Sequence, residues 1–115
     1  VLMTPLRKIV RPLMKKPGEG PSKEVRENGW FSATYKALAE DGDVSVFKMH
    51  GKGDPGYKIT SLLVTESALC LVENEQDLPG GSDYGGILTS ATGLGGALIS
   101  RLKNAGIVFE GPMQN

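Results

Sequence analysis

The chain has 115 residues, enough for one hydrophobic core but too few for a complete two-domain cofactor enzyme. Its thirteen basic and thirteen acidic residues cancel, so the net charge excludes no partner but gives no reason to expect nucleic acid or an anionic membrane. A single cysteine excludes an internal disulfide framework and is typical of a reducing compartment, so we expect a cytoplasmic protein.

The first predicted helix follows Thr4 as its N-cap and Pro5 as its first residue. Its apolar residues recur at helical spacing: Leu6, Ile9, Val10, Leu13 and Met14. The opposite side is basic, with Arg7, Lys8, Arg11, Lys15 and Lys16. Such a helix could lie on a membrane surface, but a packed helix with a solvated basic face is the favoured interpretation. A second, short helix is predicted over 23–28, between Ser22 and Gly29.

Two segments rich in aromatic and β-branched residues, 30–39 and 44–50, are joined by a turn that contains Asp41-Gly42. This pattern predicts an antiparallel hairpin. The second segment carries apolar residues on both faces, which are Val44, Val46, Phe47 and Met49. We therefore expect this strand to lie inside a larger sheet.

The segment 57–73 is apolar around most of its circumference and predicts a helix that needs cover on nearly every side. An irregular loop over 74–86 follows, then a helix from the Thr89 cap to about Lys103, and a short strand over 107–110. The expected fold is α+β, with element order α-α-β-β-α-α-β and an antiparallel hairpin or sheet with helices packed on one side. Residues 1–115 are expected to form a single domain.

The stretch "GKGDPG", Gly51–Gly56, matches the dinucleotide-binding pattern G-x-G-x-x-G letter by letter. A strand precedes it and a helix follows it, but Pro55 lacks an N–H and Asp54 brings a carboxylate to where a phosphate would sit. No parallel strand follows that could complete the βαβ unit. We predict that Asp54 is a helix N-cap, that Pro55 is the first helical residue, that the glycines adopt positive φ, and that the chain holds no cofactor loop.

Other candidate sites are weak. His50 is the only histidine, which excludes a multi-histidine metal site, and Cys70 is interpreted as a small core residue. A catalytic Cys-His pair is conceivable but not favoured, because nothing indicates an accessible thiol in electropositive surroundings. The aromatic residues of the hairpin lack an interleaved basic groove, so we expect no nucleic-acid partner. We predict no catalytic and no metal-binding residue in this chain.

Three stretches together carry a family resemblance: "PGEGPSKEVRENGWF", "GDPGYKITSLLVTESALCLV" and "GGILTSATGLGGALISRLKNAGIVFE". In this order and spacing the chain resembles, over about residues 5–110, the C-terminal part of saccharopine dehydrogenase-like oxidoreductases, a group that includes bacterial trans-acting enoyl reductases. It departs from that pattern at Ser90, where relatives commonly have Pro. It also departs in the three glycines across 93–96, each of which weakens a helix by roughly 1 kcal/mol relative to Ala.

The resemblance implies that an N-terminal Rossmann domain, absent from this chain, binds NAD or NADP in the full-length enzyme. The present chain is then a C-terminal substrate and dimerisation region that forms a homo-oligomer, and its tail, residues 85–110, packs on the Rossmann domain. The residues expected on the substrate side are Gly53, Asp54, Pro55, Gly56, Tyr57 and Thr60. His50 is a weaker candidate for proton transfer.

The leading hypothesis is therefore a C-terminal part of an NAD(P)-dependent oxidoreductase that is inactive in isolation. The alternative is a non-catalytic dimerisation or protein-binding module, in which the apolar helix and the glycine-rich tail pack against a partner. Peripheral membrane attachment through the basic N-terminal helix is a third, weaker hypothesis. The substrate and the choice between NAD and NADP are left open.

Overall fold

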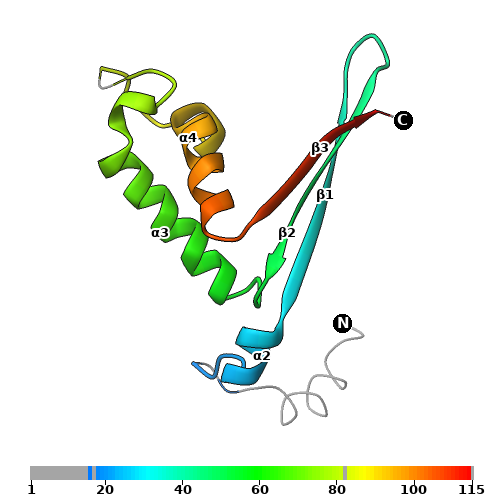
Figure 1. Ribbon diagram of the computed structural model, residues 1–115, viewed down its shortest axis with the longest axis vertical. Coiled ribbons are helices and arrows are strands. Elements are labelled where there is room, and N and C mark those ends of the chain that lie inside the picture. The colour runs from blue at the N-terminus through cyan, green and yellow to red at the C-terminus, as the bar shows by residue number, and fades with distance from the viewer. Residues whose placement is uncertain (1–15, 17, 82, 115) are drawn as a thin grey trace, which may run out of the picture.

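The computed structural model describes residues 16, 18–81 and 83–114 (Figure 1). The first predicted helix, with Pro5 as its first residue and its apolar stripe over 6–14, lies outside these residues. The elements of the described part are α2 (Lys23–Asn28), β1 (Trp30–Leu38), β2 (Val44–Lys52), α3 (Lys58–Glu73), the 3-10 helix η2 (Glu75–Asp77), α4 (Ser90–Asn104) and β3 (Val108–Gln114). The predicted α+β class and the order of its elements are confirmed, with η2 as a short addition inside the loop predicted over 74–86.

The three strands form one antiparallel sheet in the order β1-β2-β3. β1 and β2 are a hairpin whose pairing runs without interruption from Trp30↔Lys52 to Leu38↔Val44. β2 is the central strand, as its two apolar faces predicted. β3 continues beyond the expected 107–110 and reaches Gln114, with a register shift where it pairs with β2 between Val46 and Lys48.

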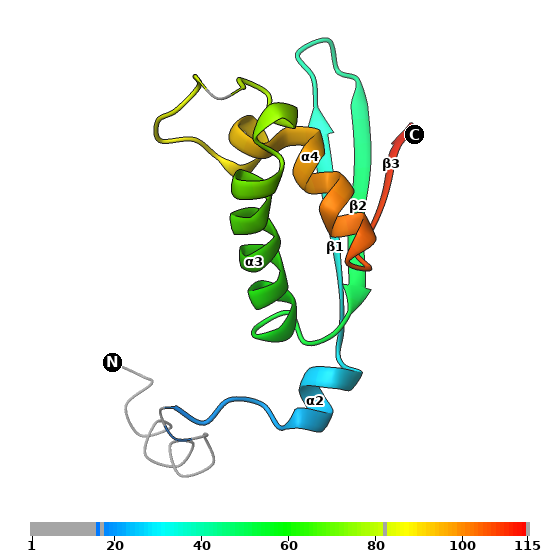
Figure 2. The same ribbon diagram turned by 60° about the vertical axis from the view of Figure 1, so that its left-hand side comes forward.

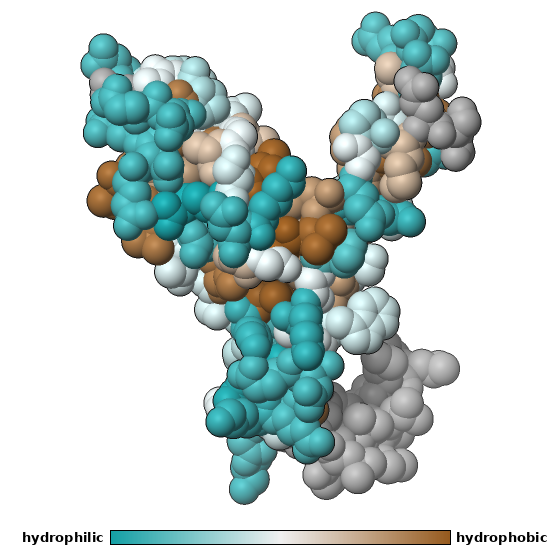
Figure 3. All heavy atoms as spheres, viewed as in Figure 1, coloured by the Kyte–Doolittle hydropathy of each residue, from teal (hydrophilic) through white to brown (hydrophobic). Residues whose placement is uncertain are grey.

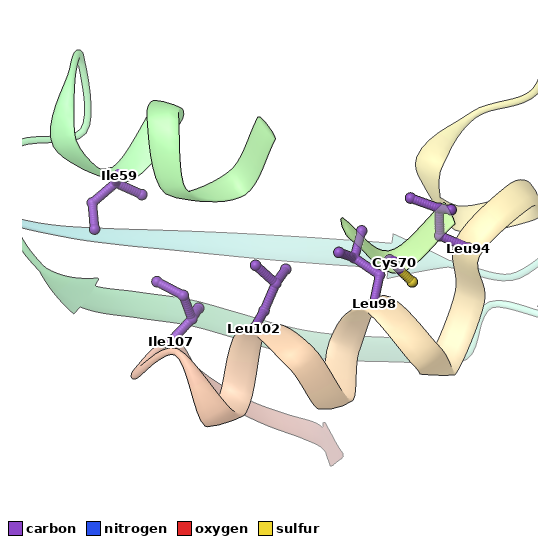
Figure 4. Close-up of a cluster of buried hydrophobic side chains, with 6 residues drawn as sticks. All are labelled: Ile59, Cys70, Leu94, Leu98, Leu102 and Ile107. Carbon is purple, nitrogen blue, oxygen red and sulfur yellow. The ribbon is translucent and has the colours of Figure 1, made fainter. Parts of the chain in front are cut away.

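Helices α3 and α4 lie on the same side of the sheet, near the end of the hairpin where β1 begins, and the hairpin turn projects beyond them (Figures 1 and 2). Six buried apolar residues form the core between these elements: Ile59, Cys70, Leu94, Leu98, Leu102 and Ile107 (Figure 4). The three leucines recur every four residues on α4 and form its inward stripe. Phe31, Met49 and Phe109 of the sheet pack against them.

Helix α4 begins at a capping box, because the Thr89 hydroxyl accepts the N–H of Thr92 and the Thr92 hydroxyl accepts the N–H of Thr89. Gly95, with φ 49° and ψ −134°, interrupts the helix with a kink. A Cβ at Gly95 would lie 2.7 Å from Cγ of Pro79, so both the backbone angle and the close approach require glycine here.

The outward side of α3 remains apolar and uncovered within the described part of the chain. Val64, Leu71 and Val72 are 65%, 57% and 79% exposed. Figure 3 shows apolar side chains reaching the surface of the helical half of the molecule. The sequence predicted that other parts of the protein pack against nearly every side of α3. The described residues pack against one side of it.

Arg101 joins α4 to α3 by polar contacts at the edge of the core. Its Nε donates to Glu66 Oε2 at 2.9 Å, and its Nη1 donates to Glu73 Oε2 at 2.7 Å and to Asn74 Oδ1 at 3.0 Å. The hydrogen bond to Glu73 raises the pKa of the Arg101 guanidinium, and the bond to Glu66 acts in the same direction. The Arg101 and Glu66 side chains are 19% and 21% exposed, so water replaces these contacts poorly.

Replacing Arg101 by Ala is expected to lower the free energy of unfolding more than removal of an exposed cation does, since Glu66 loses its partner in a partly buried position. Urea denaturation followed by circular dichroism measures the change. Lys103→Ala removes an exposed cation from the same helix and is expected to change stability by less than about 0.5 kcal/mol. Equal effects of the two substitutions would contradict the structural role of Arg101.

Candidate functional site

The turn Gly53–Tyr57 connects β2 to α3 and is fixed to the end of α2. The N–H of Gly53 donates to the carbonyl of Gly29 at 2.6 Å, and the N–H of Asp54 donates to the carbonyl of Arg26 at 3.0 Å. Gly53 is buried and has φ 133°, which side-chain-bearing residues rarely adopt. The position of the turn therefore depends on α2 as well as on its own sequence.

The Asp54 carboxylate closes the turn by accepting the N–H of Tyr57 at 2.7 Å. The carbonyl of Asp54 accepts the N–H of Ile59 at 3.0 Å. The N-cap of α3 is Tyr57, so the prediction that Asp54 is the N-cap and Pro55 the first helical residue is wrong by three positions. The Asp54 side chain accepts a backbone N–H three residues further on, as an N-cap side chain does, but it does so in the turn that precedes the helix.

The three glycines of this stretch serve different purposes, and the prediction of positive φ holds only for Gly53. At Gly51 a Cβ would lie 2.9 Å from the Phe31 ring and 3.1 Å from Cδ1 of Ile107, so this glycine lets the strand approach the core closely. Gly56 lies beside the Asp54 carboxylate in an exposed position.

The last predicted substrate-side residue joins the same turn, because the Thr60 hydroxyl donates to the carbonyl of Pro55 at 2.6 Å. The structure thus brings all six predicted residues into one surface feature, with Thr60 exposed and the Tyr57 side chain 57% exposed. Their role in binding a substrate stays a prediction.

This turn does not fit a dinucleotide diphosphate. A phosphate loop offers free backbone N–H groups, but those of Gly53, Asp54 and Tyr57 already donate to protein oxygens, and Pro55 has none. The Asp54 carboxylate also places a negative charge at the centre of the turn. The geometry therefore supports rejecting "GKGDPG" as a cofactor loop.

A pocket of about 360 Å³ opens at the opposite end of α3. Its apolar lining comes from α3, the following loop and the start of α4: Leu71, Leu78, Tyr84, Leu88 and Leu94. Leu71 is fourteen residues from Tyr57, about 20 Å along the helix axis, so none of the predicted site residues contributes to it. Sequence reasoning missed this pocket because the glycine-rich segment 80–86 indicates only a loop.

His50 and Cys70 do not form a catalytic pair. Met49 packs against the core, so the neighbouring His50 side chain points to the other face of the sheet, where its Nε2 lies 3.0 Å from Glu110 Oε1. Cys70 is fully buried, and burial raises the pKa of its thiol. Within the described ranges, no three potential metal ligands cluster. None of the helices in those ranges is long and apolar enough to cross a membrane.

The chain is similar over most of its length to mycobacterial proteins. It is 39% identical over 104 residues to a candidate trans-acting enoyl reductase of Mycobacterium tuberculosis and 32% identical over 104 residues to a trans-acting enoyl reductase of Mycobacterium bovis; each match covers 90% of this chain and 24% of the relative. A trans-acting enoyl reductase of Mycobacterium ulcerans is 33% identical over 96 residues, 83% of this chain and 22% of the relative. The chain thus spans about a quarter of the length of these relatives.

No family model matches the chain, and no solved structure matches it with significance.

Replacing Gly29 by Ala tests the attachment of the turn to α2. A Cβ there would lie 2.8 Å from the Asp54 nitrogen and 2.9 Å from the Val25 carbonyl oxygen, although φ is an ordinary −62°. We expect a loss of about 2 kcal/mol from this clash and faster hydrogen exchange at the Gly53 and Asp54 amides.

The matched control is Gly96→Ala, where a Cβ meets no atom within 4 Å in a helical position. It is expected to raise stability by up to about 1 kcal/mol. Unchanged exchange of the Gly53 and Asp54 amides in the Gly29→Ala chain would show that α2 does not hold the turn.

Proposed function

We propose that this chain is the C-terminal part of a saccharopine dehydrogenase-like, NAD(P)-dependent oxidoreductase that reduces an enoyl group. The observation that carries the proposal is the similarity of 90% of the chain to about a quarter of the length of enoyl reductases. The chain's own contribution is then to hold the substrate side of the reaction and to make subunit contacts, while the hydride donor is bound elsewhere in the enzyme.

The proposed substrate-side element is the turn Gly53–Tyr57 with Thr60. Its backbone is held by hydrogen bonds to α2, and its first amide groups are already used, so the side chains rather than the backbone are available to a ligand. The Tyr57 hydroxyl is the exposed hydrogen-bonding group of this turn that is best suited to orient a carbonyl oxygen. The ion pair of Lys58 with Glu27 further ties this end of α3 to α2, and the hydrogen bond from Lys58 lowers the pKa of the Glu27 carboxyl. A site held by two elements in this way is preorganised.

The uncovered face of α3 is the proposed contact with the remainder of the enzyme. Val64, Leu71 and Val72 present an apolar surface without charge between them, which is costly to leave in water. A partner of about three times the length of this chain, as the relatives imply, is large enough to bury it. We place the NAD(P) site in that remainder, because the turn at Gly51–Gly56 does not fit the cofactor.

Titration of the 115-residue chain with NADPH and with NAD⁺ by calorimetry tests the location of the cofactor. We expect no binding to the isolated chain. Micromolar affinity for either nucleotide would contradict the proposal that the cofactor belongs to another part of the enzyme.

A chimera tests the substrate-side role. The matching segment of the Mycobacterium bovis enoyl reductase is replaced by this chain, and NADPH-dependent reduction of an enoyl thioester is measured. We expect activity, and a KM raised about tenfold or more by Tyr57→Ala with a smaller change in kcat. An inactive but folded chimera would count against the family function.

The companion variant is Tyr84→Ala, which alters the pocket at the far end of α3. A KM that rises with Tyr84→Ala and not with Tyr57→Ala would move the substrate to the pocket and refute the turn as the substrate-side element.

A further inference from the structure

The outer edge of β1 is open along nine residues, since the order of the sheet gives β1 a single neighbour among the described strands. Edge strands in natural proteins usually carry a proline, a bulge or inward charges that prevent pairing with another chain. β1 has no proline, its pairing with β2 shows no register shift, and Lys36 is its only charged residue. This edge is therefore competent to accept a further strand.

The other edge of the same sheet has the protective features that β1 lacks. β3 contains Pro112, which cannot donate a hydrogen bond, and Gly111 with φ 114°. The register shift between Val46 and Lys48 lies opposite these two residues. The contrast between the two edges indicates that β3 is protected against pairing with a further strand, whereas β1 can pair with one.

We propose that a second copy of this chain pairs antiparallel with β1, with Thr34 on the two-fold axis, so that the two sheets join into one of six strands. In this register all nine residues of each strand find a partner, and Thr34 of one copy faces Thr34 of the other. Such isologous pairing is the simplest closed symmetry for two identical edges. The proposal does not depend on the reaction that the enzyme performs.

The sequence of β1 is complementary to itself in this register. On one face Trp30 meets Leu38 of the other copy, and these side chains are 74% and 72% exposed in the single chain. The remaining facing pairs are Phe31 with Ala37, Ser32 with Lys36, and Ala33 with Tyr35. Each aromatic ring therefore faces an aliphatic side chain, and no charge faces a like charge. A register centred on Lys36 would instead place two lysines face to face.

Antiparallel pairing would also cover the part of the hairpin that α3 and α4 leave exposed. The helices lie near the start of β1, whereas the hairpin turn stands away from them (Figure 1), and Tyr35 is 55% exposed. The two-fold axis sets the end of β1 in one copy beside the start of β1 in the other. Tyr35 then lies next to Ala33 of the second copy, on the side of the sheet that carries α3 and α4.

Thr34→Glu is the decisive variant. Within one chain Thr34 pairs with Lys48, so the new carboxylate gains an opposite charge and the fold is preserved, whereas the dimer would bring two glutamates together at the axis. We expect the wild-type chain to dimerise at micromolar to submillimolar concentration by light scattering, and Thr34→Glu to raise the dimer dissociation constant about tenfold or more. Circular dichroism checks the fold of each variant.

The single tryptophan gives a local readout of the same interface. Trp30 is expected to shift its fluorescence emission to shorter wavelength as the wild-type chain is concentrated, and to shift less in Thr34→Glu. Mixing Thr34→Glu with Thr34→Lys chains is expected to restore the dimer, because opposite charges then meet at the axis.

Thr65→Glu is the matched control, since it places the same charge on the exposed side of α3. Dissociation by Thr65→Glu but not by Thr34→Glu would assign the contact to α3 and overturn the proposal. A wild-type chain that stays monomeric with constant Trp30 emission would overturn it too. The β1 edge would then be expected to pair with a strand other than β1 of a second copy.

Discussion

The burial of six apolar side chains between α3, α4 and one half of the sheet is the interaction on which this structure depends. Within the part of the chain that the structure describes this core is small, because fifteen large apolar side chains there remain exposed. At about 25 cal/mol per Å² of apolar surface removed from water, every uncovered residue is a stabilisation not gained. The described part of the chain therefore consists of a helical half and a hairpin, and each of them exposes apolar side chains to water.

The elements of this fold could be predicted from the sequence wherever a local pattern was strong. Thr89 with its capping box, the Asp41-Gly42 turn and the two apolar faces of β2 each led to the correct element, because their chemistry acts within a few residues. The start of α3 was misplaced by three residues, since Asp-Pro marks the onset of a turn whether or not the helix begins at once. The kink at Gly95 depends on its contact with Pro79, sixteen residues away, which no local pattern reveals.

The candidate site shows the same division. The letters of "GKGDPG" allow a cofactor loop, while the side-chain chemistry of Pro55 and Asp54 argues against one. The structure adds the reason that sequence could not supply, which is that the amides of Gly53 and Asp54 donate to α2. Gly29 is similar: its place after a short helix is typical of a positive-φ helix stop, but it has φ −62°, and glycine is required because the backbone of Asp54 lies against it. A glycine's purpose is set by what packs against it, so its spacing alone is weak evidence of function.

The two uncovered surfaces differ in what they can recognise. The exposed face of α3 is apolar, and hydrophobic contacts are not directional. This face would therefore select a partner by shape, and any large apolar surface of complementary shape could bury it. The edge of β1 is a row of backbone donors and acceptors at fixed spacing, so it selects a strand, and the side chains of that strand fix its register. Because α3 and the β1 edge belong to different elements, the contact proposed at α3 would leave β1 available for the proposed pairing (Figure 1). The two proposed contacts thus involve different elements, and only the one at β1 is self-complementary.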